Sequence, residues 1–305
     1  LTDSHFTKVS NFEKLTTSGT GNTSVSLGTN FANTFQSGLT YTTGTLADGS
    51  TLTFNGGLYT GDVKLTSVSS AVGDGAAEDI TIVTGSGSDT ISFTAAAFVG
   101  HAATNATISI TSGAGNDSIY LETGTIVDSA TNQAFIIDAG TGKDTIELVK
   151  VNAANATKKG FALITVDAGD SLTSSYDVIT GFDKSDGTDV SDTLDFTGNA
   201  AISDFSQSVN SGVIKSHSIS AGIVTFDDTE TFDTALVIGS SNLSDVIGYL
   251  VGNTANLDTI AFAYDTSGNG TADSTFVYNN NTVDSLVLLQ DVTLGSLVDA
   301  ATSAT

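Results

Sequence analysis

A short segment rich in glycine and aspartate occurs three times in the chain at a nearly constant spacing. The copies align without gaps as TGSGSDTIS (84–92), SGAGNDSIY (112–120) and AGTGKDTIE (139–147). Their aspartates, Asp89, Asp117 and Asp144, are separated by steps of 28 and 27 residues. Repeats with periods of about 20 to 50 residues are typical of proteins that stack one structural unit on the next. The repeat therefore predicts a solenoid.

The stretches between these segments have the composition of β-strands. They are short, rich in β-branched residues and bounded by Gly, Ser, Thr, Asn and Asp, which favours strands over helices. Clear examples are 80–83, 106–110, 134–137 and 161–166. The best helical spacing of apolar residues lies at 241–252. We predict an all-β fold, a parallel β-roll or β-solenoid extended by a β-rich C-terminal segment with one short helix.

The repeated segment places a carboxylate after a glycine turn in every coil. Glycine supplies the positive φ angles or close backbone approach that a sharp turn between stacked strands needs. If one repeat forms one coil, successive coils lie about 4.8 Å apart and the three aspartates form a column of like charges. A divalent cation between the coils would relieve their repulsion. The expected ligands in the turns are Gly85, Gly87, Asp89, Gly113, Gly115, Asp117, Gly140, Gly142 and Asp144.

The composition identifies calcium as the expected cation. The chain has 305 residues, nine Lys and no Arg, against 34 acidic residues, and its net charge is −25. Of the acidic residues 29 are Asp and five are Glu. Repulsion alone would favour either acid equally, whereas short Asp side chains in glycine-rich turns suit Ca²⁺, which takes oxygen ligands. We therefore expect calcium to be a folding ligand.

The same composition excludes several classes of function. Without Arg or a basic stripe, binding to nucleic acid is not expected, and anionic membranes are disfavoured for the same reason. No run of about 20 apolar residues predicts a membrane span. The chain has no Cys, which excludes disulfides and thiolate metal sites. Leu1 is not an initiator methionine, so we expect the chain to be a fragment.

Enzymatic activity is not expected either. The three histidines, His5, His101 and His217, lie far apart, and the chain contains neither the G-x-S-x-G nor the H-E-x-x-H motif. Aspartates at turn spacing favour cation binding over glycosidase chemistry. The remaining alternative for the glycine turns is an ordinary hairpin turn without metal.

The three segments resemble the RTX nonapeptide G-G-x-G-x-D-x-U-x, whose copies build a calcium-binding parallel β-roll. The first glycine is replaced by Thr84, Ser112 or Ala139, and the copies are not tandem at nine residues. We therefore expect the motif on one edge of the roll and longer loops on the other. A weaker copy at 18–26 has Thr23 in place of Asp.

The stretch 176–196 looks like the segment that closes RTX rolls, and 167–183 looks like a stretched fourth copy of the motif. The resemblance extends the expected calcium ligands to Asp138, Asp167, Gly169, Asp177, Asp183 and Asp192.

Two further segments are similar to S-layer proteins of Gram-negative bacteria that leave the cell by type I secretion. Residues 8–27 look like their repeated "x-F-E-x-L" β-coil unit, and 259–292 resemble their terminal β-segment. This resemblance implies an uncleaved export signal at 292–305. Within 259–292, a D-x-S-x-N-G-x-x-D spacing predicts a calcium loop in a hairpin, with ligands Asp265, Ser267, Asn269 and Asp273. An EF-hand is not expected, because Phe276 stands where that motif needs Glu.

Together these features predict three segments: a degenerate β-coil at 1–75, an RTX-like β-roll at 76–200 and a β-rich segment with the export signal at 201–305. The expected function is structural, in an extracellular surface layer (S-layer) on the cell. The chain would fold on Ca²⁺, bind copies of itself in a two-dimensional lattice and reach cell-surface polysaccharide through regions outside this sequence. Two alternatives stay open: an RTX adhesin that binds another cell, a glycan or ice, and the export and folding domain of a larger secreted enzyme.

Overall fold

The computed structural model describes residues 1–10, 12–34, 37–46, 50–66, 69–70, 79–93, 107–123, 125–126, 134–150, 158–159, 161–183, 191–198, 200–201 and 207–294. The chain divides into two compact units. The solenoid unit comprises Leu1–Val166 and Ser185–Asp195, and the C-terminal unit comprises Asp167–Lys184 and Phe196–Thr305.

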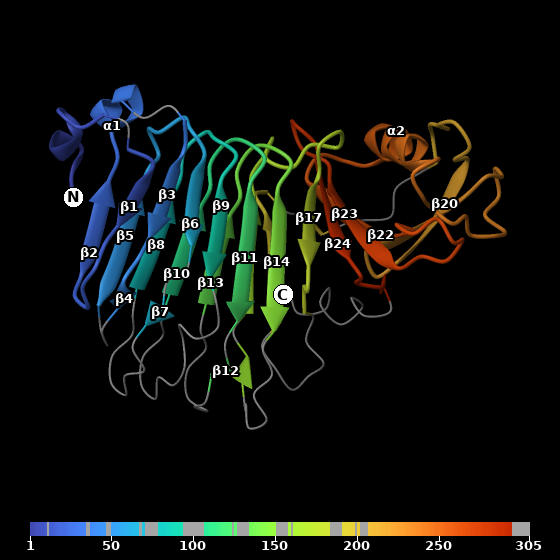
Figure 1. The fold of residues 1–305 in the computed structure, drawn as a ribbon. Helices are drawn as coiled ribbons and strands as arrows, with labels where there is room; N and C mark the ends of the chain where they lie inside the picture. The colour runs from blue at the N-terminus through green and yellow to red at the C-terminus, as the bar shows by residue number, and fades with distance from the viewer. Residues whose placement is uncertain are drawn as a thin grey trace. The chain divides into compact units, whose positions relative to one another are not determined.

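In the solenoid unit, short strands alternate between two sheets (Figure 1). Sheet A contains, in spatial order, β1 (Lys14–Thr16), β3 (Leu39–Thr42), β6 (Val63–Thr66), β9 (Thr90–Phe93), β11 (Ser118–Thr123) and β14 (Thr145–Lys150). Sheet B contains β2 (Thr23–Ser26), β5 (Thr51–Asn55), β8 (Asp79–Val83), β10 (Thr107–Thr111), β13 (Ala134–Asp138), β16 (Phe161–Val166) and β18 (Thr193–Phe196). The described strand pairs from β1 to β14 and from β2 to β16 are parallel, which confirms the predicted β-solenoid.

Two minor ladders lie outside these sheets: β4 (Thr45–Leu46) pairs in parallel with β7 (Ser69–Ser70), and β12 (Thr125–Ile126) pairs antiparallel with β15 (Lys158–Lys159). The strands of the predicted 1–75 segment pair with those of the 76–200 segment, since β5 adjoins β8 and β6 adjoins β9. The described strands of both segments therefore share one stack.

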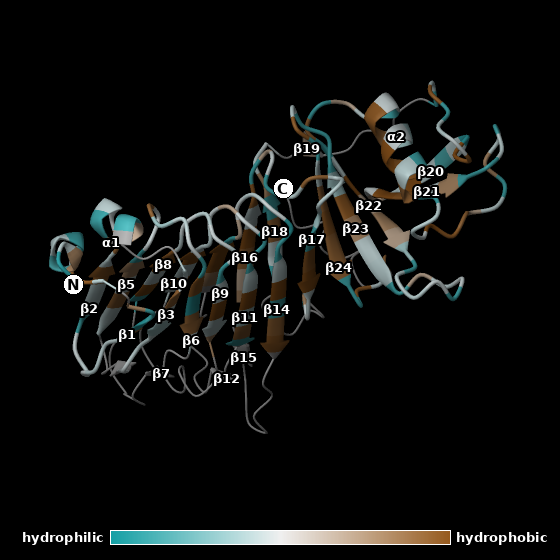
Figure 2. Cartoon of the chain, turned by 45° about the horizontal axis from the view of Figure 1, so that its top comes forward, coloured by the Kyte–Doolittle hydropathy of each residue, from teal (hydrophilic) through white to brown (hydrophobic). Residues whose placement is uncertain are grey.

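Equivalent residues of successive coils lie side by side. Ile91, Ile119 and Ile146 are register partners in sheet A, and all three are buried. Sheet B shows the same alternation, with Ile80 beside Ile108 and small polar residues between the buried positions. Figure 2 shows that apolar residues are concentrated in the strands and polar residues in the turns. Each coil thus contributes a layer of aliphatic side chains to one continuous core.

The first coil is closed by two short helices that the sequence did not predict, η1 (Asp3–Phe6) and α1 (Thr29–Thr34). The Asp3 carboxylate accepts hydrogen bonds from the backbone N–H groups of Gly28 and Phe31 at 2.9 Å. The Phe6 and Phe31 rings pack edge to face at 4.9 Å. These contacts cover apolar surface at the N-terminal end of the stack.

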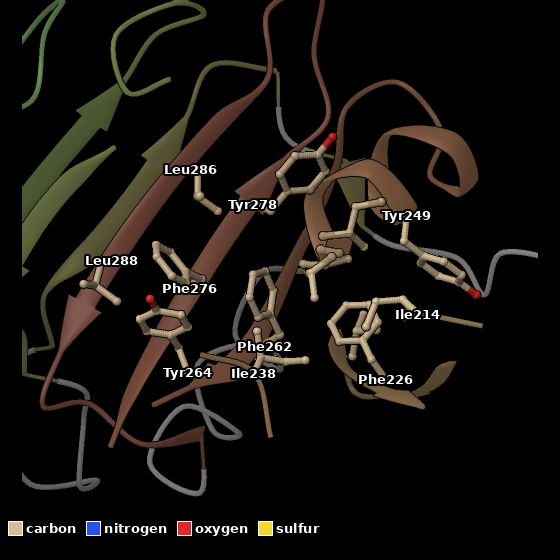
Figure 3. Packing of buried hydrophobic residues seen from close by; sticks show 14 residues of the cluster. Ile214, Phe226, Ile238, Tyr249, Phe262, Tyr264, Phe276, Tyr278, Leu286 and Leu288 are labelled. Atoms are coloured by element: carbon tan, nitrogen blue, oxygen red, sulfur yellow. The ribbon is translucent and has the colours of Figure 1, made fainter. Parts of the chain in front are cut away.

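The C-terminal unit is a mixed sheet covered by a helix. Its strand order is β17 (Asp177–Thr180), β24 (Ser285–Gln290), β23 (Ser274–Asn279), β22 (Asp258–Tyr264), β21 (Ile223–Asp227) and β20 (Ser216–Ser220), with β19 (Ala200–Ala201) beside β22. Helix α2 (Leu243–Asn253) forms where the apolar spacing predicted it. Its Val246, Tyr249 and Leu250 pack with Phe226 and Phe262 in an aromatic-rich core (Figure 3).

A buried carboxylate organises one loop of this unit and makes its stability sensitive to acid. Asp227 Oδ1 accepts the N–H of Thr229, and Oδ2 accepts those of Asp233 and Thr234 at 2.7 Å. Burial alone would raise the pKa of Asp227, but these N–H donors outweigh it and hold the pKa well below its usual range. The folded chain therefore gains stability above the ordinary Asp pKa of about 3.9 and loses it as the pH falls toward the depressed value.

We expect Asp227→Asn to be less stable than the wild type at about pH 7, with a difference that shrinks toward about pH 2.5. Urea denaturation of both proteins at the two pH values measures this difference. A gap of the same size at both values would contradict the assigned role.

Candidate metal centre

The three repeated aspartates form the predicted column. Asp89, Asp117 and Asp144 directly precede β9, β11 and β14, whose register places equivalent residues side by side. Their side chains are 1%, 3% and 0% exposed. Three carboxylates are thus stacked inside the edge where sheet B turns into sheet A.

Each aspartate binds the coil before it through one carboxylate oxygen. Asp144 Oδ1 accepts the N–H of Asp117 at 2.7 Å, and Asp117 Oδ1 accepts the N–H of Asp89 at 2.7 Å. Asp89 Oδ1 in turn accepts the N–H of Val63 at 2.6 Å. This N–H ladder satisfies buried backbone donors and fixes the register of the coils.

The second carboxylate oxygens of Asp89 and Asp117 are buried inside the turn. Asp89 Oδ2 and Asp117 Oδ2 have no hydrogen-bond partner among the residues that the structure describes. Burial raises the pKa of Asp89 to about 6, against the lowering effect of the Val63 N–H. Burial likewise raises the pKa of Asp117. A buried carboxylate oxygen without a donor is a position that a cation or a proton would stabilise.

The motif glycines are explained by the approach of the neighbouring coil. A Cβ atom on Gly113 would lie 2.1 Å from the Gly85 carbonyl oxygen, and one on Gly115 would lie 2.1 Å from that of Gly87. The Gly85 oxygen accepts the N–H of Ala114 at 2.9 Å. The turn carbonyl oxygens of Gly85 and Gly113, two of the glycines predicted as ligands, therefore hold adjacent coils together. Each keeps a second lone pair.

The oxygen atoms near the column are of the types that bind a hard cation. They are carboxylate, hydroxyl and carbonyl oxygens, the ligands that Ca²⁺ takes. Within the described part of the chain, no group of three or more acidic or histidine side chains is placed to hold one ion. An ion at the column would thus depend on hydroxyl and carbonyl ligands as well as on carboxylates.

A second ladder on the outside of the same turns was not anticipated. Asp62 Oδ1 accepts the N–H of Ser88 at 2.8 Å, and Asn116 Oδ1 accepts the N–H of Lys143 at 3.0 Å. Each of these side chains accepts a hydrogen bond from the following coil, whereas each aspartate of the N–H ladder accepts one from the coil before it. The sequence feature that could have predicted this ladder is an Asp or Asn directly before the position of the column. Asp62 precedes Val63 in this way, and Asn116 precedes Asp117.

The weaker copy at 18–26 lies on the other edge of the solenoid. It connects β1 of sheet A to β2 of sheet B, whereas the three aspartate turns lead from sheet B to sheet A. At the coil before Asp89, the equivalent position is held by Val63, since Lys64 pairs with Thr90. The described column therefore begins at Asp89.

Two other predicted ligands of the solenoid unit make local hydrogen bonds away from the column. Asp138 ends β13 and accepts the N–H of Gly140 at 3.0 Å. Asp192 is buried beside β16, where it accepts the N–H of Ala162 at 2.8 Å. Both positions lie next to sheet B strands, so neither carboxylate joins the three at the start of the sheet A strands.

The remaining ligands predicted around 167–183 belong to the C-terminal unit. Asp167 accepts the Thr197 hydroxyl, and its N–H donates to Asp170 at 2.7 Å. Gly169 has a φ of +98°, and Asp183 is half-buried. Asp177 begins β17, is buried and donates its N–H to the Ser171 hydroxyl at 2.7 Å.

The predicted loop of Asp265, Ser267, Asn269 and Asp273 joins β22 to β23 as a hairpin. Asp265 Oδ1 accepts the N–H of Gly268 and Oδ2 that of Gly270, both at 2.7 Å. Asp273 Oδ1 accepts the hydroxyl of Thr266 at 2.6 Å. For Asp265, backbone N–H groups outweigh burial and lower the pKa, while the Thr266 hydroxyl is the main cause of the lowered pKa of Asp273. Both carboxylates therefore already accept hydrogen bonds from donors of the turn.

The fold and the column define the class: a parallel β-solenoid with aspartates stacked inside its turns. No protein family matches the chain, and no curated protein or solved structure does either. None of the helices in the described ranges is long and apolar enough to cross a membrane.

Proposed function

We propose that the chain is a structural part of a secreted, calcium-dependent surface layer. In this proposal Ca²⁺ outside the cell completes the solenoid, and the folded chains assemble with copies of themselves into a two-dimensional lattice at the cell surface. The observation that carries it is the pair of buried, donor-free oxygens Asp89 Oδ2 and Asp117 Oδ2 in a column of stacked carboxylates. The net charge of −25 further favours the binding of cations.

The surface-layer role is favoured by the solenoid fold of the first unit together with the resemblance to RTX and S-layer segments. A solenoid is a regular, extended scaffold whose coils contact only their neighbours, which suits a repeating assembly. The buried aspartate recurs at the same position in successive coils, and a structural role accounts for this repetition without further chemistry.

The test is calcium-triggered assembly of the whole 305-residue chain. We expect negative-stain electron microscopy to show ordered sheets after addition of millimolar CaCl₂ to chelator-treated protein, and none after MgCl₂ at the same ionic strength. A chain that folds with calcium and stays monomeric at every concentration would reject the layer and favour the adhesin alternative. Sheets that persist in EGTA would reject the role of calcium.

A further inference from the structure

Two buried hydroxyl groups accompany the aspartate column, and a third is missing. Thr84 and Ser112 stand five residues before Asp89 and Asp117, and both are buried. The third turn has Ala139 at the equivalent position before Asp144. These three residues replace the first glycine of the RTX-like motif, so the motif itself gives them no role.

The hydroxyl protons are directed along the stack. Thr84 Oγ1 donates to the carbonyl oxygen of Ser112 at 2.7 Å, and Ser112 Oγ donates to that of Ala139 at 2.9 Å. A hydroxyl has one proton and two lone pairs. Once the proton is given to the next coil, the hydroxyl oxygen can only accept.

Each hydroxyl also lies against the carboxylate of its own turn. The Thr84 hydroxyl interacts with Asp89, and the Ser112 hydroxyl interacts with Asp117. The Oδ2 atoms of both aspartates are buried with no hydrogen-bond partner in the described part of the chain. Two oxygens that both lack a proton toward each other repel, unless a positively charged group lies between them.

We propose that the hydroxyl oxygens of Thr84 and Ser112 are ligands for the cation of the column, each together with the Oδ2 atom of the aspartate in its turn. The inference rests on the proposed calcium binding and assigns ligands that the motif does not contain. It makes the sites unequal: the turns of Asp89 and Asp117 bind calcium more tightly than the turn of Asp144, which has Ala139 instead of a hydroxyl.

The test is a calorimetric CaCl₂ titration of the full chain and of three variants. Thr84→Val keeps the branched shape and removes the oxygen, and Ser112→Ala does the same for the smaller side chain. We expect each to weaken one site about tenfold, the loss of roughly one neutral ligand. Ala139→Ser adds an oxygen at the third turn, and we expect it to strengthen the weakest site.

The matched control is Thr165→Val. Thr165 donates its hydroxyl to a carbonyl of a neighbouring coil, that of Ile137 at 3.2 Å, but its side chain is half-buried on β16 of sheet B and belongs to none of the three aspartate turns. We expect it to leave the calcium affinities unchanged. Melting in EGTA separates a purely structural contribution of each hydroxyl from its contribution to calcium affinity.

The outcomes distinguish this inference from the function on which it rests. If the wild type binds no calcium, both are rejected. If the wild type binds calcium and Thr84→Val and Ser112→Ala titrate like Thr165→Val, the hydroxyl ligands are rejected and calcium binding stands. A loss of stability in EGTA with unchanged calcium affinity would also overturn the inference.

Discussion

In excess EGTA the chain is expected to lose most of its β-sheet circular dichroism, and to recover it when millimolar calcium is restored. Extracellular calcium modules bind at about 10⁻⁴ to 10⁻³ M. At about 1 mM calcium and a dissociation constant of about 10⁻⁴ M, each site adds about 1.4 kcal/mol to the free energy of unfolding. Four such sites would add about 5 to 6 kcal/mol, comparable to the whole stability of a marginal domain.

The substitution Asp117→Asn separates the charge of the column from its hydrogen bonds. Asparagine keeps an oxygen that can accept the Asp89 N–H, which Asp117 Oδ1 accepts at 2.7 Å. It removes one of the stacked charges and one cation ligand. We expect the variant to be less stable than the wild type in calcium and at least as stable in EGTA, whereas Asp117→Ala loses stability in both.

Circular dichroism and thermal melting in the two buffers measure these effects, and magnesium at equal ionic strength is the control for screening. A circular dichroism spectrum that stays unchanged in EGTA would show that the N–H ladder and the core suffice without metal. If Asp117→Asn changed the melting temperature relative to the wild type by the same amount in calcium and in EGTA, the charge of Asp117 would have no role in calcium binding.

The second large effect is expected from Gly140→Ala. Gly140 has a φ of +74°, and a Cβ atom there would lie 1.8 Å from the carbonyl oxygen of Gly113 in the coil before. The neighbouring atom is backbone held by a hydrogen bond to Thr141, so it cannot move away without breaking the ladder between the coils. We expect a loss of at least about 4 kcal/mol of stability, or failure to fold.

Gly21→Ala is the matched control for this substitution, because Gly21 lies in a turn of similar sequence with nothing within 4 Å of its Cβ position. We expect its effect to stay within about 0.5 kcal/mol. Chemical denaturation in calcium compares the two variants. Similar losses for both would mean that the close approach of the coils is not what requires glycine.

The repeat made the solenoid predictable because it is local and regular. Three copies with steps of 28 and 27 residues, each followed by an alternating strand such as Thr90–Phe93, were enough to predict coils stacked in register. The apolar spacing at 241–252 likewise predicted α2, which runs from Leu243 to Asn253. The aspartate column followed from the same register.

The details of the turns were not predictable, because they depend on which atoms of neighbouring coils approach each other. The sequence could not show that Asp117 Oδ1 would bond to the N–H of Asp89, or that the Gly85 oxygen would accept the N–H of Ala114. The copy at 18–26 has the same two glycines but lies on the opposite edge. In the C-terminal unit, β17 pairs with β24, which lies more than 100 residues later in the sequence, and no repeat indicates this pairing.

The N–H ladder of the three aspartates has a direction, opposite to that of the ladder on the outside of the same turns. Each carboxylate belongs to the later coil and each donor to the earlier one, as in the bonds from Val63 to Asp89 and from Asp89 to Asp117. A chain that emerged with its C-terminal end first would present each carboxylate of the aspartate ladder before the N–H group that it accepts, and the reverse would hold for the outer ladder. Each newly emerged coil would then add to coils that have already folded, and the solenoid would grow toward the N-terminus before the remaining residues emerge.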